Sequence, residues 1–178
     1  MSGICIYAEQ YENRIEESAF ELITAARALS AQSGEHIMAL VLGQDPDALS
    51  RQLSFQDVQV AAVKTEISAL QDDALSICVA EALRQLAPSS VLIPANRTCR
   101  ALFSRVAARM DVGLTADCSE LFLNESGEFL QRKSAFGENA MCVTAEVGTP
   151  KLDACYVDIG AKDEEQARRM VQEKLMLT

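Results

Sequence analysis

The chain has 178 residues, of which 49% are hydrophobic and 24% charged, and its formal net charge is −10. This length and composition predict one globular domain, residues 1–178, with a substantial core. The negative charge argues against nucleic-acid and anionic-membrane binding, both of which need a cationic surface. No apolar run approaches membrane-spanning length and no signal-peptide pattern opens the chain, so we expect a cytoplasmic protein without membrane insertion.

The first 110 residues alternate short apolar runs with longer segments of helical period. Strands are predicted at 4–8, 36–42, 58–63 and 91–93, and helices at 16–30, from 45 onward, at 69–86 and at 97–110. Strands that are apolar on both faces and alternate with helices are typical of a parallel sheet covered on both sides. We therefore predict an α/β fold of three layers, α/β/α, with a mostly parallel sheet.

The pattern changes after Gly113. Strands are predicted at 114–123, 128–136, 140–147 and 154–159, joined by short polar or glycine turns. We expect this antiparallel C-terminal section to extend or edge the parallel sheet, and a charged helix to follow at 162–176.

No pattern of catalytic or cofactor-binding residues stands out. The eight glycines form neither a dinucleotide fingerprint nor a phosphate loop, and the six cysteines have no CxxC spacing. His36 has no second histidine to complete a metal site and is more simply a structural residue. Cys99 shares a helical face with apolar residues, which predicts a buried, inert thiol. We expect no catalytic, cofactor-binding or metal-binding residue, and no enzyme activity of the chain's own.

Four arginines gather on the predicted helix at 97–110. At about 100° per residue, Arg97 and Arg100 lie opposite the face of Cys99, flanked by Arg105 and Arg109. Two interpretations stay open: a solvated helix surface, or an interface for an acidic partner, since arginine is favoured in contacts.

Five segments resemble, in the same order, the N-terminal domain of the electron transfer flavoprotein alpha subunit. The first match is the opening strand and helix, through Ala8-Glu9, Glu21-Leu22-Ile23 and Ala26-Arg27, and the second is the strand that ends at Gly43. The third match runs through Pro94, Ala95, Arg100, Leu102, Arg105, Val106, Ala107 and Ala108. The last two run through Gly113, Leu114, Asp117 and Leu121, and through Gly137, Asn139, Ala140 and Val143. The chain departs from the family at Cys99, Ala101 and Glu138, where the family has glycine, aspartate and glycine.

The resemblance implies a Rossmann-like fold of the adenine nucleotide alpha hydrolase-like type and a part in electron transport. In this flavoprotein family, electrons pass from dehydrogenases through FAD to an acceptor, and a second, C-terminal domain of the alpha subunit holds most FAD contacts. The resemblance thus implies FAD in the full assembly, none bound to this chain alone, and a heterodimer with the beta subunit. The candidate partner-interface residues are Arg97, Arg100, Arg105, Gly137 and Asn139.

Two other functions stay open. A stand-alone nucleotide-binding domain would place its pocket at the carboxyl ends of the strands, near Glu9, Gly43 and Asn96, although the missing glycine loop counts against it. A protein-interaction module would use the same surfaces without a flavin. Because no FAD-holding domain is expected within the chain, it is either a fragment of an alpha subunit or a natural short homologue.

Overall fold

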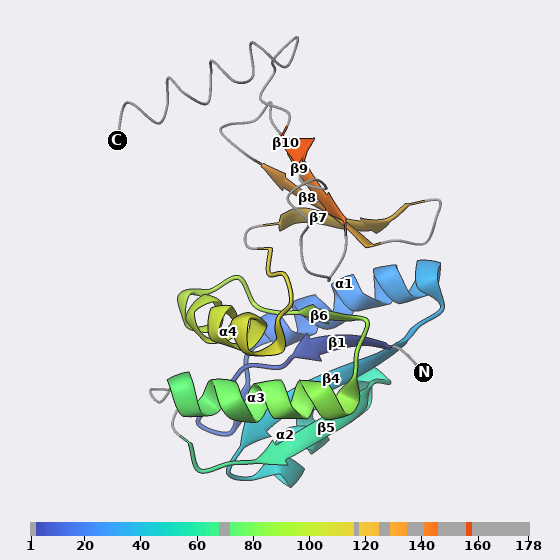
Figure 1. Cartoon of the computed structure of the whole chain (residues 1–178). Helices are drawn as coiled ribbons and strands as arrows, with labels where there is room; N and C mark the ends of the chain where they lie inside the picture. The colour runs from blue at the N-terminus through green and yellow to red at the C-terminus, as the bar shows by residue number, and fades with distance from the viewer. Residues whose placement is uncertain are drawn as a thin grey trace, which may run out of the picture.

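The computed structural model describes residues 3–67, 72–115, 118–124, 129–134, 141–145 and 156–157. Its centre is a four-stranded parallel sheet in the order β5-β4-β1-β6 (Figure 1). The strands are β1 (Gly3–Tyr7), β4 (His36–Gly43), β5 (Gln59–Lys64) and β6 (Ser90–Leu92). Each pair runs in the same direction, which confirms the predicted parallel sheet.

Helices cover both faces of this sheet, which confirms the three-layer arrangement. On one face lie α1 (Glu17–Ser33) and α2 (Pro46–Leu53), and on the other α3 (Asp72–Leu86) and α4 (Arg97–Met110), side by side (Figure 1). Alternate residues of β1 supply the two cores: Ile4 and Ile6 pack toward α1 and α2, whereas Cys5 and Tyr7 pack toward α3 and α4. This is the period-two alternation of a strand buried on both faces.

Local signals set the helix ends. Gly34 follows α1 with φ of 72°, a left-handed conformation that glycine adopts without strain. Asp45 caps α2 by accepting a hydrogen bond from the backbone N–H of Ala48, and Pro46 takes the first helical position. A single 3-10 turn, η1 (Ser54–Gln56), connects α2 to β5.

A small hairpin between β1 and α1 has no counterpart in the sequence prediction. It consists of β2 (Gln10–Tyr11) and β3 (Arg14–Ile15), and its turn residues Glu12 and Asn13 have φ of 50° and 60°. Two left-handed residues in a two-residue loop are the geometry of a type I′ turn, which matches the twist of a hairpin. The turn contains no glycine, so the usual sequence signal is missing.

The antiparallel section forms a sheet of its own. Its strands are β7 (Cys118–Leu123), β8 (Phe129–Ser134), β9 (Met141–Ala145) and β10 (Tyr156–Val157), in the order β10-β9-β8-β7. Among the described residues none of them joins the parallel sheet, so the prediction that this section extends or edges that sheet was wrong. Residues 112–115, which have no regular structure, lead to β7, and β7 lies beside α1 instead of pairing with a strand of the parallel sheet. Leu121 of β7 packs against the core there. The predicted helix at 162–176 lies outside the described residues.

Candidate functional site

The carboxyl ends of β1, β4 and β6 bring Glu9 and Asn96 together. The Asn96 amide donates a hydrogen bond from Nδ2 to the Glu9 carboxylate at 2.5 Å. The Asn96 Oδ1 accepts a hydrogen bond from the backbone N–H of Cys99 at 2.8 Å, so Asn96 is the N-cap of α4. A helix N-terminus attracts anions, but here one of its N–H donors is satisfied by the cap and a carboxylate of the chain itself lies at the first turn. These contacts disfavour a phosphate at this position.

Next to the hydrogen bond between Glu9 and Asn96, Cys99 is buried against the core, with 1% of its surface exposed. Burial is the main cause that raises the pKa of its thiol to about 12. The negative charge of Glu9 and a hydrogen bond to that carboxylate also raise the pKa, whereas a hydrogen bond with Asn96 lowers it. The thiol is therefore protonated at neutral pH and is not a nucleophile. The prediction of a buried, inert thiol is confirmed.

Gly43 ends β4 at a close approach to α2. A Cβ atom on Gly43 would lie 2.5 Å from Cδ1 of the fully buried Leu49 and 3.5 Å from Nε2 of Gln10. The Gly43 carbonyl accepts a hydrogen bond from the N–H of Thr65. This glycine lets a helix pack on a strand and is not part of a phosphate-binding loop.

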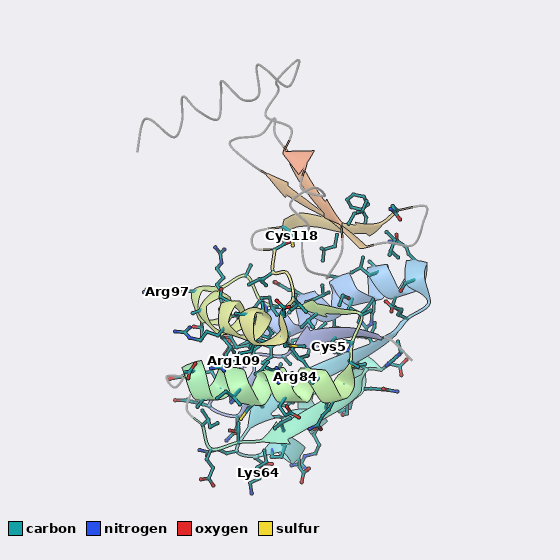
Figure 2. All side chains as sticks on the ribbon, viewed as in Figure 1. Cys5, Lys64, Arg84, Arg97, Arg109 and Cys118 are labelled. Carbon is teal, nitrogen blue, oxygen red and sulfur yellow. The ribbon has the colours of Figure 1, made fainter. Side chains whose placement is uncertain are left out.

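The exposed side of α4 carries three of the predicted interface residues, Arg97, Arg100 and Arg105, which we call the arginine face. Arg100 donates to the carbonyl of Ala95 and Arg105 to that of Ala101, so both guanidinium groups lie along the helix surface. Figure 2 shows Arg97 at the outer edge of the molecule, whereas Cys5 lies inside it. The side chains of Arg97 and Arg100 point away from the buried side of the helix, as the helical wheel predicts.

Arg109 belongs to a different contact. Its Nη2 pairs with Asp73 at 2.5 Å and its Nε donates to the Ser76 hydroxyl at 2.9 Å, while its carbonyl accepts from Arg84. Arg109 therefore ties α4 to α3 and does not extend the arginine face. Sequence reasoning could not separate it from the other arginines, because the helical wheel carries no information on α3. The two remaining interface candidates, Gly137 and Asn139, lie outside the described residues.

A groove of about 950 Å³ runs along the outer edge of β6, between α1 and α4. Apolar side chains such as Leu22, Ala25 and Phe103 line it, and no described strand pairs with β6 on this side. The groove follows the edge of the sheet and reaches Pro94 and Ala95, which follow the carboxyl end of β6. Its lining is mainly apolar and includes no glycine-rich loop of the kind that binds a phosphate.

No helix in the described part of the chain is long and apolar enough to cross a membrane. No group of three or more histidine, cysteine, aspartate or glutamate side chains is placed to hold a metal ion there.

The family match and the similar proteins agree with one another. The family model described as electron transfer flavoprotein domain matches residues 4–170. The chain is 34% identical over 141 residues to the lactate dehydrogenase (NAD(+),ferredoxin) subunit LctC of Acetobacterium woodii, covering 78% of this chain and 34% of that protein. It is 32% identical over 140 residues to the electron transfer flavoprotein subunit alpha of Thermoanaerobacterium thermosaccharolyticum, covering 78% and 42%. The acryloyl-CoA reductase electron transfer subunit beta of Anaerotignum propionicum is 28% identical over 147 residues, covering 80% and 40%. The chain thus spans less than half the length of these relatives.

Proposed function

Because the chain belongs to the electron transfer flavoprotein family as an alpha-subunit N-terminal domain, we propose that it is the assembly domain of an electron-carrying complex. In this role it packs against a beta subunit and helps seat the FAD-bearing part of the complex, through which electrons pass from dehydrogenases to an acceptor. The observation that carries the proposal is the family match from residue 4 to residue 170, together with relatives named as electron-transfer subunits. The chain itself catalyses no reaction in this proposal, and residues 1–178 act as one domain.

The described residues do not fit an FAD. A dinucleotide needs a close approach of backbone N–H groups at a helix N-terminus, but Asn96 caps α4 and Glu9 places a negative charge at its first turn. The space beside Gly43, where a side chain is absent, is occupied by the side chain of Leu49 and is not open to a ligand. We therefore assign the flavin of the complex to another part of the assembly, and no step of electron transfer is attributed to these residues.

The arginine face is the proposed contact with the beta subunit. It is a local basic surface on a chain with a net charge of −10, so an acidic surface on the partner would be attracted to this face and repelled by the acidic remainder of the chain. Arginine is also enriched among residues that dominate binding energy. Gly137 and Asn139 stay candidates for the same interface.

A binding experiment with the beta subunit tests the proposal. Arg100→Glu and Arg105→Glu are each expected to weaken binding about tenfold or more, which corresponds to about 1.4 kcal/mol. Arg51→Glu is the matched control, because Arg51 is also exposed but lies on α2, and this substitution changes the charge by the same amount. Undiminished binding of both α4 variants would remove the arginine face from the interface. A wild-type chain that does not bind the beta subunit would refute the assembly role.

Titration with AMP and ATP tests the alternative of a stand-alone nucleotide-binding domain. We expect no binding, because the polar groups at the carboxyl ends of the strands are paired with one another. Finally, the described cysteines Cys5, Cys78, Cys99 and Cys118 are free thiols, which fits a reducing compartment, and we propose a cytoplasmic location.

A further inference from the structure

The outer edge of β6 is buried, although no described strand pairs with it. Ser90 and Leu92 are 5% and 9% exposed, and within the described part of the chain β6 pairs with β1 on one side only. The N–H of Ser89 donates to the carbonyl of Gly3 on β1. Because a parallel strand uses alternate residues for its two neighbours, the N–H and C=O groups of Ser90 and Leu92 face the other side. The hydroxyl of Ser90 is also buried and has no hydrogen-bond partner among the described residues. Buried polar groups nearly always have a partner, so we expect this edge to be covered.

The groove along this edge has the length of a helix. Its lining runs from Ala95, just before α4, to Gly113, shortly after it, with residues of α1 on the opposite wall. Since α4 has 14 residues, the groove is about 21 Å long at 1.5 Å per residue. Leu22, Ala25 and Phe103 make its walls apolar, and its volume is about 950 Å³. A helix laid over a sheet edge is one of the ways in which proteins cover such an edge.

The chain contains a segment of matching size and character outside the described residues. The helix predicted at 162–176 would be about 22 Å long. Its apolar residues Ala167, Met170, Val171 and Leu175 recur at three- and four-residue steps and form one stripe, while most of its other side chains are charged. A cylinder of that length and about 10 Å across has a volume of about 1,700 Å³, so the groove would hold about half of it. An amphipathic helix buries its apolar side in this way, and without such packing a helix of this length is marginal in water.

The segment also begins within reach of the groove. β7 borders the groove through Leu121, and β10, which ends at Val157, lies three strands away in the order β10-β9-β8-β7. At about 4.8 Å per strand, that distance is about 14 Å. The steps from Val157 to residue 162 span up to about 17 Å when extended. The chain can therefore cross its antiparallel sheet and enter the groove where the predicted helix starts.

We propose that residues 162–176 form a helix that docks in the groove and covers the outer edge of β6. The apolar stripe of this helix packs against the walls formed by α1 and α4, and its charged side faces the solvent. The occupant is a segment of the same chain, so the inference concerns the fold of this chain and does not rest on the proposed function. Its consequence is that the β6 edge is closed to strand pairing with another chain, which is the route by which free sheet edges associate.

Amide hydrogen exchange followed by NMR tests the inference on the intact chain. In the wild-type chain the N–H groups of Ser90 and Leu92 should exchange slowly, because the docked helix shields them from water. Val171→Glu places a charge in the apolar stripe and should speed this exchange about tenfold or more. Glutamate has a higher helix propensity than valine, so the change reports lost docking and not a lost helix. Gln172→Glu is the matched control, because it adds the same charge at the adjacent position, outside the stripe, and should leave the exchange rates unchanged.

A second measurement needs no variant. Nuclear Overhauser contacts are expected in the wild-type chain between the methyl groups of Val171 and the side chains of Leu22 or Phe103. Absence of contacts between residues 162–176 and the groove walls would overturn the proposal, and so would equal exchange rates in the two glutamate variants. Protection of Ser90 that depends on protein concentration would mean that a second copy covers the edge, and the proposed occupant would be wrong. A chain whose helix docks but which does not bind the beta subunit would refute the proposed function and leave this inference standing.

Discussion

Replacement of Gly43 by alanine should destabilise the protein through a collision in the core. The new Cβ would lie 2.5 Å from Cδ1 of Leu49, about 1 Å closer than the favourable separation of two carbon atoms. Leu49 has no exposed surface, so its side chain has no solvent to rotate into, and β4 and α2 must separate instead. Overpacking of this kind costs about 1–3 kcal/mol. Loss of glycine freedom in the unfolded chain offsets about 0.4–1 kcal/mol, so we expect a net loss of about 1–2 kcal/mol.

Urea unfolding followed by circular dichroism measures this loss, and a double-mutant cycle identifies its cause. Leu49→Ala alone should cost about 2–5 kcal/mol, but it removes the atom with which the new methyl collides. The double variant should therefore lose less than the sum of the two single variants. Gly34→Ala is a useful contrast, since no atom lies within 4 Å of its new Cβ and only the φ of 72° opposes the change. Strictly additive effects of Gly43→Ala and Leu49→Ala would refute the collision.

Four further predictions concern the cap of α4, the reactivity and titration of the cysteines, and the contact of α4 with α3. Asn96→Ala should lower the free energy of unfolding by about 1 kcal/mol through loss of the helix cap, whereas Asn96→Ser should retain most of it, as urea unfolding will show. In the native chain at pH 8, a thiol reagent should modify the exposed Cys118 while sparing Cys5 and Cys99, whose pKa burial raises to about 12; mass spectrometry will report the sites. Because the folded pKa of Cys99 lies above its ordinary value of 9.0, its contribution to stability is complete below pH 9 and is lost as the pH rises toward 12; Cys99→Ala should flatten that part of the pH profile. Arg109→Ala should cost less than about 1 kcal/mol, because its partner Asp73 is largely exposed, and the loss should shrink in high salt.

The sequence predicted the parallel half of the fold well because local signals and burial agree there. The helix predicted at 97–110 is found at Arg97–Met110, since Asn96 supplies the cap and the apolar stripe ends with the helix. The same period-two and period-3.6 patterns located β1, β4 and α1 within three residues of their observed ends. The antiparallel strands were also found, through the short turns at hairpin spacing between them, but which edge they pair with is a tertiary property that turn spacing does not encode.

The hairpin and the pairing of Glu9 with Asn96 were harder to predict because their contacts join distant parts of the chain. Glu9 and Asn96 are 87 residues apart, and Gln52 reaches the hairpin from 37 and 39 residues away. A two-residue strand has no detectable period, and the turn at Glu12 and Asn13 lacks glycine, so no local pattern predicts the hairpin. The exposed face of α4 was predictable, since periodicity alone places Arg97 and Arg100 opposite Cys99.

The carboxyl ends of the parallel strands show why this surface suits a protein better than a small ligand. In folds of this class, a ligand site at this position needs unpaired N–H groups and space between the loops. Here the amide of Asn96 is used twice, once for the helix cap and once for Glu9, and the space at Gly43 is filled by Leu49. Among the groups left exposed are the ring of Tyr11, which is 68% exposed, and Arg97, which Figure 2 shows at the outer edge of the molecule. Exposed aromatic and arginine side chains are the chemistry of a protein interface.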